Sequence, residues 1–327
     1  MNRSSEDRHE GTGHGVTRRD VWLRMLLYPR HTLPTAAAPM MVAAGLAWHD
    51  GVFAFFPLLA AFLCGWLIQL GGVITDNYFN LKRHPHDREH ALFVQALNAG
   101  IIKLDELKSA IYGCYLLAIL IALYLVYVGG LPVIWVGAAS IIASLIYSAG
   151  PFPLGDNALG DPLFFIFFGV VSVVAPYYVQ AAAVLASPWL WTIPAGTISG
   201  TVLWASIPMA ALITNILVID NIRDLDFDQA KGETTLAVVL GRRGSYIEYC
   251  LLLGLAYFIP LMLWLLNGLS IWVLLPWLSL PYALLVARRV ITAQSYAELM
   301  PLTPQAGQVV LAYALLFAFG LARYTQL

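Results

Sequence analysis

Charged side chains are scarce in this 327-residue chain, where they make up 11% of the residues while hydrophobic ones make up 60%. An ordinary soluble domain carries roughly 25% charged residues. The composition therefore excludes a typical water-soluble protein and predicts an all-α, polytopic membrane protein in a lipid bilayer. For a membrane protein the formal net charge of −1 says nothing about nucleic acid, and the distribution of charge matters more. We expect a lipid bilayer around the chain and no nucleic-acid partner.

Cysteine is also scarce. Cys64, Cys114 and Cys250 lie in apolar runs, which gives neither a disulfide framework nor a metal-ligand spacing. The first 19 residues lack the apolar core of a signal peptide. We expect a polar cytoplasmic tail over residues 1–27, followed by a single transmembrane domain over residues 28–327.

Long apolar runs, by contrast, are abundant. A transmembrane helix needs about 20 mostly apolar residues to cross the hydrocarbon core of a bilayer. The sequence contains about nine such segments, and membrane bundles tolerate the prolines that several of them contain. The predicted spans cover residues 33–48, 52–75, 107–128, 131–147, 162–184, 193–219, 246–266, 270–287 and 305–323.

Lys and Arg are nearly absent from one side of this predicted bundle. If nine spans alternate in direction, the N-terminal tail and the loops after spans 2, 6 and 8 lie on the same side. Those segments and their borders hold every Lys and Arg except Arg323. Because Lys and Arg concentrate in cytoplasmic loops, we expect a cytoplasmic N-terminus, in what we expect to be a bacterial inner membrane.

The most distinctive polar stretch, residues 220–228, directly follows an apolar run and contains Asp220, Asp224, Asp226 and Asp228. On a helix, Asp220, Asp224 and Asp228 would share one face, where like charges repel. Mg²⁺ would reverse this repulsion, since it takes oxygen ligands and bridges carboxylates to substrate phosphates. The alternative interpretation is an acidic, solvated loop end.

A similar stretch follows the second span, four spans earlier. Residues 76–80 read Asp-Asn-Tyr-Phe-Asn and residues 220–224 read Asp-Asn-Ile-Arg-Asp. This weak repeat predicts two polar loops that face each other across one cavity. Carboxylates from two sides could hold Mg²⁺ and a diphosphate, while cations neutralise the remaining phosphate charge. The nearby cations are Lys82, Arg83, Arg223 and Lys231.

Departure of a diphosphate from an allylic substrate would create a carbocation. An apolar bundle would exclude water from that cation, and a long isoprenoid tail suits a membrane cavity for ordinary hydrophobic reasons.

Several segments together resemble the UbiA-type membrane prenyltransferases, and within them the 1,4-dihydroxy-2-naphthoate polyprenyltransferases of menaquinone synthesis. The likeness runs from about residue 28 to residue 321. It is carried by residues 30–34 (Arg-His-Thr-Leu-Pro), 147–155 (Tyr-Ser-Ala-Gly-Pro-Phe-Pro-Leu-Gly), 159–161 (Leu-Gly-Asp), 177–180, 221–228 and 235–243.

This resemblance implies about nine helices around a central cavity that opens laterally to the bilayer. It also implies Mg²⁺-dependent transfer of a polyprenyl group from an allylic diphosphate to an aromatic acceptor, here 1,4-dihydroxy-2-naphthoate or a related quinone precursor. The implied catalytic residues are Asp76, Asn80, Tyr147, Asp224 and Asp228. The expected metal ligands are Asp76, Asn80, Asp220, Asp224 and Asp228, and the expected diphosphate ligands are Lys82, Arg223 and Lys231.

The first motif departs from the family pattern. The family usually has Asn-Asp-x-x-Asp, whereas this chain has Asp76 and Asn77, followed three residues later by Asn80. In addition, Asp156 stands where the branch often has tyrosine. An amide oxygen brings less charge to Mg²⁺ than a carboxylate does. The departure predicts weaker metal binding at the first motif, or a different reaction or acceptor.

Two other functions stay open at this point. A membrane terpene cyclase of the same fold, or a prenyltransferase for another phenol, would share these motifs. A transporter is a remote alternative, because the proposed repeats would be parallel and the acids lie near one membrane face rather than at the midplane.

Overall fold

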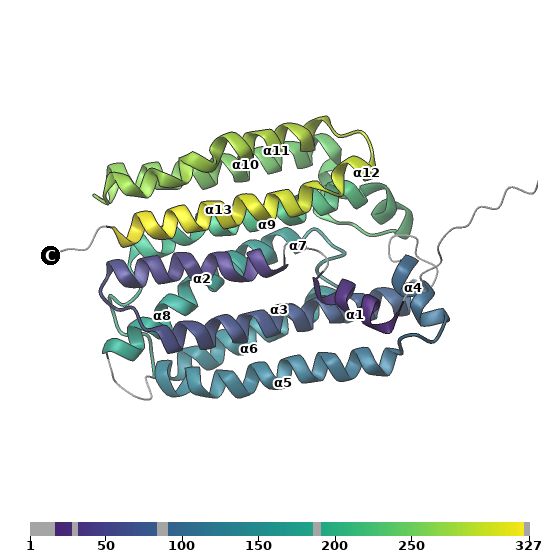
Figure 1. Ribbon diagram of the computed structural model, residues 1–327, viewed down its shortest axis with the longest axis horizontal. Helices are drawn as coiled ribbons and strands as arrows, with labels where there is room; N and C mark the ends of the chain where they lie inside the picture. The colour runs from purple at the N-terminus through teal and green to yellow at the C-terminus, as the bar shows by residue number, and fades with distance from the viewer. Residues whose placement is uncertain (1–16, 28–31, 84–90, 186–190, 324–327) are drawn as a thin grey trace, which may run out of the picture.

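The computed structural model describes residues 17–27, 32–83, 91–185 and 191–323, which fold almost entirely into helices (Figure 1). Within those ranges no β-strand forms, and an isolated bridge joins Asn157 to Thr234. The all-α class is therefore confirmed. The helices are α1 (Arg18–Leu27), α2 (Thr32–His49), α3 (Phe55–Arg83), α4 (Ala91–Asn98), α5 (Leu104–Gly129), α6 (Leu131–Ser148), α7 (Gly160–Phe164), η1 (Phe165–Val171), α8 (Ser172–Leu185), α9 (Gly200–Lys231), α10 (Leu236–Leu266), η2 (Ile271–Ser279), α11 (Leu280–Thr292), α12 (Tyr296–Leu299) and α13 (Leu302–Ala322).

Eight stretches of the described chain are long and apolar enough to cross a membrane. Helices α7, η1 and α8 form one of them, η2 and α11 another, and α12 with α13 a third. The remaining predicted span, residues 33–48, corresponds to α2. This 18-residue helix lies within the bundle but is not among the eight. All nine predicted segments are thus helical in the structure, and eight of them have the length and composition of a membrane span.

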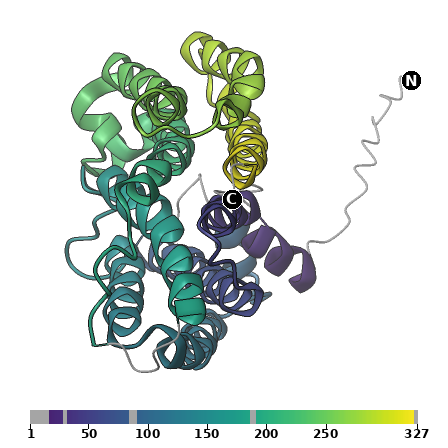
Figure 2. The ribbon, with the colours of Figure 1, turned by 90° about the vertical axis from the view of Figure 1, so that its left-hand side faces the viewer.

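The spans form a closed ring. Each packs against the next along the chain, and α13, the last, packs along α2, the first. Figure 2 looks along the bundle and shows α2 and α13 side by side near the C-terminus. Helix α8 packs against both α2 and α3, and α9 packs against α13. These cross-contacts fill part of the ring.

Small residues allow close approach of the backbones. A methyl group added at Gly169 would lie 2.1 Å from the Cα of Ala210, and one added at Gly320 would lie 2.2 Å from the carbonyl oxygen of Trp272. Close contacts of this kind stabilise helix association in lipid. Lipid chains are as apolar as the side chains, so no hydrophobic effect drives the helices together.

Large apolar side chains cover the outside of the bundle. On α5, Leu116, Leu120 and Leu123 are 58%, 53% and 61% exposed. Such faces suit contact with lipid chains rather than with water. By contrast, 78% of the most apolar part of α9 is buried, so α9 forms an inner wall of the bundle.

Both acidic motifs lie on helices, so the prediction that they form loops was wrong. Helix α3 continues through the first motif to Arg83, and α9 continues through the second to Lys231. Gly232 then ends α9 in the left-handed conformation, at φ 79°. The predicted span at 193–219 also began too early, because Ser199 caps the start of α9 by accepting a hydrogen bond from the backbone N–H of Val202.

The predicted polar tail also needs a correction. Its last residues form helix α1, which packs against α3 and α4. Residues 1–16 of the predicted tail lie outside the described residues.

Candidate functional site

A cavity of about 1080 Å³ lies among α3, α9, the α6–α7 loop and the α12–α13 region. One part of its wall is polar and the other is apolar. Its charged and amide-bearing lining residues are Gln69, Asp76, Asn77, Asn80, Asp156, Asp220, Asn221, Arg223, Asp224, Asp228, Lys231 and Glu233.

The α3 wall carries the first motif. Asp76 and Asn80 are one turn apart, and the amide of Asn80 donates to Asp76 Oδ2 at 3.3 Å. Ser148, at the end of α6, donates to Asp76 Oδ1 at 2.7 Å. The amide of Asn77 instead donates to the carbonyl of Val73 within the same helix, at 2.8 Å. Asp76 thus supplies the negative charge of this wall, held in place by two neighbours.

The α9 wall carries the second motif in the stacked arrangement that its spacing predicts. The guanidinium of Arg223 donates to both carboxylate oxygens of Asp224 and to Asp220 Oδ1. Thr303, on α13, donates to the same oxygen of Asp220 at 2.8 Å. A planar guanidinium that bridges two carboxylates forms strong charge-assisted hydrogen bonds, and these offset the repulsion between Asp220 and Asp224.

Asp228 lies one turn further along α9 and is 6% exposed. Thr235, the N-cap of α10, donates to Asp228 Oδ2 at 3.3 Å. The backbone carbonyl of Asp228 accepts from the N–H of Glu233 at 2.9 Å. Lys231, from the last turn of α9, also lines the cavity. The end of α9 therefore brings an acid and a cation to one wall.

Asp156 lies in the α6–α7 loop and pairs with Arg83, at 2.6 Å between Asp156 Oδ2 and Arg83 Nη1. Burial raises the pKa of the Asp156 carboxyl, and the Arg83 guanidinium opposes that rise. The same guanidinium donates to the backbone carbonyl of Ser148. The pair therefore joins the end of α3 to the loop.

Aromatic rings line the apolar part of the cavity. Phe164 and Phe168 stack with centroids 4.3 Å apart, and the Tyr147 ring lies 5.5 Å from Phe164. Tyr296 also lines the cavity, with its ring centre 5.7 Å from the Arg223 guanidinium. An amphiphilic molecule with an anionic head and an unsaturated tail would match these two regions.

The donor set fits Mg²⁺ only if the substrate shares its coordination. Among the described residues, no three His, Cys, Asp or Glu side chains converge closely enough to hold an ion by themselves. Mg²⁺ commonly binds through one or two carboxylates, substrate phosphates and water rather than in an all-protein cage. Acids from both α3 and α9 line a cavity that Lys231 also lines, and this suits that arrangement.

The structure brings together every predicted site residue except Lys82. Asp76, Asn80 and Tyr147 line the cavity. The five predicted residues of α9 line it as well, namely Asp220, Arg223, Asp224, Asp228 and Lys231. Lys82 is exposed and is not part of the lining, so the geometry gives no support for a diphosphate contact.

Sequence reasoning missed several partners. Ser148 and Thr303 hold the acids, and the amide of Asn221 donates to both oxygens of buried Asp161, at 3.3 and 3.4 Å. Tyr296 also went unnoticed. Ser148, Thr303 and Asp161 lie 72, 83 and 60 positions from their partners, and Tyr296 lies on the short helix α12. The motif segments 147–155 and 159–161 contain Ser148 and Asp161, but no local pattern links either residue to its partner.

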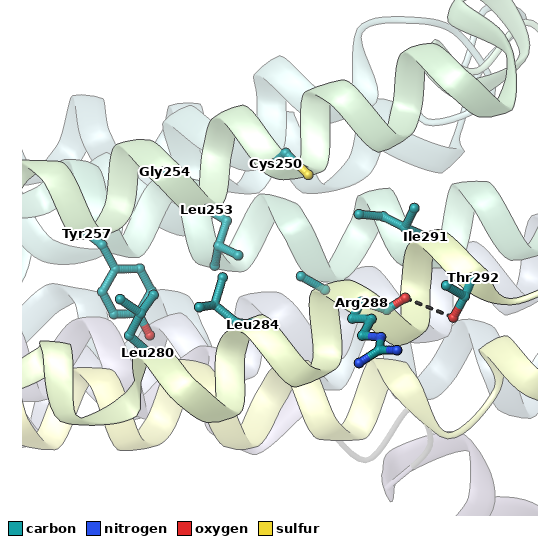
Figure 3. A pocket seen from close by; sticks show the side chains of 10 residues that line it. Cys250, Leu253, Gly254, Tyr257, Leu280, Leu284, Arg288, Ile291 and Thr292 are labelled. Atoms are coloured by element: carbon teal, nitrogen blue, oxygen red, sulfur yellow. Dashed lines mark hydrogen bonds between the residues drawn. The ribbon is translucent and has the colours of Figure 1, made fainter.

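A second, smaller pocket lies between α10 and α11 and has a volume of about 440 Å³ (Figure 3). It is lined by Cys250, Leu253, Gly254, Tyr257, Leu280, Leu284, Ala287, Arg288, Ile291 and Thr292. None of the predicted site residues is among them, and the predicted acidic ligands all line the larger cavity.

The chain is similar to known proteins over most of its length. Residues 36–303 match the model of the UbiA prenyltransferase family. The chain is 29% identical to a 1,4-dihydroxy-2-naphthoate octaprenyltransferase of Escherichia coli, over 95% of this chain and 97% of that protein. It is 27% identical to the protein of the same name from Mycobacterium tuberculosis, over 89% of this chain and 94% of that protein.

Solved structures share the fold. A UbiA homologue from Aeropyrum pernix superposes with a TM-score of 0.63 at 16% identity, over 86% of this chain and 97% of that one. A UbiA homologue from Archaeoglobus fulgidus bound to DMAPP and Mg²⁺ superposes with a TM-score of 0.57 at 14% identity, over 90% and 98% of the two chains.

Proposed function

The chain belongs to the UbiA prenyltransferase family, and we propose that it transfers a polyprenyl group from an allylic diphosphate to 1,4-dihydroxy-2-naphthoate or a closely related aromatic acceptor. The acceptor proposal is supported by relatives that are named 1,4-dihydroxy-2-naphthoate octaprenyltransferases and match most of the chain.

One observation carries the proposal: two acidic walls, on α3 and α9, face the same cavity, and aromatic side chains continue it. Asp76 and Asn80 lie on the first wall, and Asp224 and Asp228 lie on the second. A diphosphate head between the walls would leave its isoprenoid tail against the stacked rings of Phe164 and Phe168.

Mg²⁺, held by those four residues together with the diphosphate, would neutralise charge on the leaving group. Lys231 and Arg223 add fixed positive charge on the same side, which stabilises the diphosphate as negative charge develops on it. Arg223 also keeps the Asp220 and Asp224 side chains oriented toward the cavity before substrate binds.

Bond breaking follows from this arrangement. The bond between the allylic carbon and the diphosphate oxygen breaks, and its electron pair leaves with the diphosphate. The electron-rich face of Tyr147 and the apolar rings beyond it suit the allylic cation that remains, because aromatic faces attract cations and exclude water. An aromatic carbon of the acceptor then forms the new carbon–carbon bond and loses either its proton or, where it carries a carboxylate, CO₂.

The decisive experiment uses the purified protein in liposomes with a radiolabelled polyprenyl diphosphate. With 1,4-dihydroxy-2-naphthoate and Mg²⁺ we expect a prenylated lipid product, and with a metal chelator we expect none. Product from 4-hydroxybenzoate but not from dihydroxynaphthoate would show that the acceptor is a different phenol. A hydrocarbon formed without any acceptor would identify a terpene cyclase instead.

A further inference from the structure

A continuous series of contacts joins the two acidic walls of the cavity. It begins at Asp76, which accepts from the hydroxyl of Ser148 at 2.7 Å. The backbone carbonyl of Ser148 accepts from Arg83, and Arg83 also pairs with Asp156 at 2.6 Å. This half of the series ties the end of α3 to both ends of the α6–α7 loop.

The second half of the series continues from the loop to α9. The backbone carbonyl of Asp156 accepts from the N–H of Thr234 at 2.9 Å, and the neighbouring Asn157 forms the isolated bridge with Thr234. The next residue, Thr235, donates to the carboxylate of Asp228 at 3.3 Å. Every contact from Asp76 to Asp228 is therefore a hydrogen bond, an ion pair or a peptide link.

We infer that Arg83 and Asp156 are a positioning pair, which holds the first and second acidic walls at the separation that a metal-bound diphosphate requires. The inference rests on the proposed function, and it assigns the pair a role through Ser148 and Thr234 rather than through contact with the substrate. It also gives Asp156 a use in a chain whose first motif has few carboxylates.

The ion pair suits such a role because it is partly shielded from water. The Arg83 and Asp156 side chains are only 26% and 24% exposed, so their charge-assisted contact is screened less than a surface pair. The Arg83 guanidinium also lies 5.4 Å from the centre of the Phe79 ring, which adds a cation–π contact.

The same loop fixes Tyr147. A methyl group at Gly155 would lie 2.8 Å from the Tyr147 ring, and the N–H of Gly155 donates to the Tyr147 carbonyl at 2.8 Å. The loop backbone therefore lies directly against the tyrosine that lines the cavity. A loop released from Arg83 would move Tyr147 as well as Asp76.

The test compares Asp156→Asn with the wild type and with Asp226→Asn as a matched control. Asp226 lies on α9 in an ion pair with Arg242, at 3.7 Å, but it is 83% exposed and outside the cavity. Two quantities are measured: the KM values for prenyl diphosphate and acceptor, and the Kd for inorganic diphosphate with Mg²⁺ by calorimetry.

We expect Asp156→Asn to raise the KM for prenyl diphosphate and the Kd for diphosphate by about tenfold, the size of one charge-assisted hydrogen bond. The KM for the acceptor should stay within about twofold, and Asp226→Asn should match the wild type. Exchange of the two charges, in Arg83→Asp with Asp156→Arg, should restore most of the diphosphate affinity that either single change removes.

Three results would overturn the inference. They are an unchanged Kd for diphosphate in Asp156→Asn, an equal loss for both substrates, or a charge exchange that binds no better than the single variants. If Asp156→Asn does not fold, Arg83→Lys takes its place, because this change keeps the positive charge but loses the planar guanidinium. The same KM and Kd values are then measured, and the same results would overturn the inference. A wild type that neither binds diphosphate nor transfers a prenyl group would refute the proposed function, whereas an active wild type with an unaffected Asp156→Asn would refute the positioning role alone.

Discussion

Arg223 holds the second motif together before any substrate binds, so its removal should destabilise the folded protein. Its guanidinium is 13% exposed and donates to Asp220 and to both oxygens of Asp224. Removal of one partner from a buried ion pair costs about 3–5 kcal/mol. Because these side chains border a cavity, we expect Arg223→Ala to lower the free energy of unfolding by about 3 kcal/mol, the low end of that range.

The assay is denaturant unfolding of the purified protein in mixed micelles, followed by circular dichroism. Arg242→Ala is the matched control, because its pair with Asp226 is exposed and 3.7 Å long, so its loss should cost less than about 1 kcal/mol. Excess Mg²⁺ should restore part of the stability of Arg223→Ala, since a cation at the acids replaces the lost positive charge. A loss no larger than that of Arg242→Ala would refute the structural role given to Arg223.

Three further outcomes follow from packing, charge and hydrogen bonding. Gly169→Ala should lower the free energy of unfolding by about 2 kcal/mol, because the added methyl group overlaps the backbone of α9. Gly137 has open space around it, so Gly137→Ala should not lower the free energy of unfolding. Equal free energies of unfolding for the two variants would contradict this packing. In steady-state kinetics, Lys231→Gln should raise the KM for prenyl diphosphate about tenfold. The exposed Lys82 serves as the control, and Lys82→Gln should leave this KM within about twofold. A larger effect from Lys82→Gln than from Lys231→Gln would show that Lys82, rather than Lys231, contacts the diphosphate. Asp161→Ala should destabilise the fold by about 1–3 kcal/mol, because it leaves the half-buried amide of Asn221 without its charged partner. Unchanged denaturant unfolding would show that this bond contributes nothing.

The positions of the helices could be predicted from the apolar runs, because lipid leaves the backbone no alternative to internal hydrogen bonds. The ends of α3 and α9 could not. Residues 76–80 and 220–228 are rich in Asp and Asn, which favour turns over helix interiors when only local contacts count. In the structure, distant partners such as Ser148 and Thr303 hold these side chains, and the helices continue through both motifs.

The residues of the site were predictable in part. The spacing of Asp220, Asp224 and Asp228 already indicated one shared face, and the structure places all three on the cavity wall. Their pairing with Arg223 depends on side-chain direction, which spacing alone does not give. The link from Arg83 to Asp156 spans 73 positions, and no local pattern in a single sequence marks such a pair.

The central claim is that the α9 acids act with Mg²⁺ on the diphosphate of the substrate. Its most direct test is the rate of prenyl transfer by the double variant Asp224→Asn, Asp228→Asn, with Asp226→Asn as a control on the same helix. The isosteric double change removes both charges, and we expect the rate to fall by about 100-fold or more, in line with loss of electrostatic stabilisation in other enzymes. Asp226→Asn should retain the wild-type rate, and wild-type transfer by the double variant at ordinary Mg²⁺ concentrations would contradict the claim.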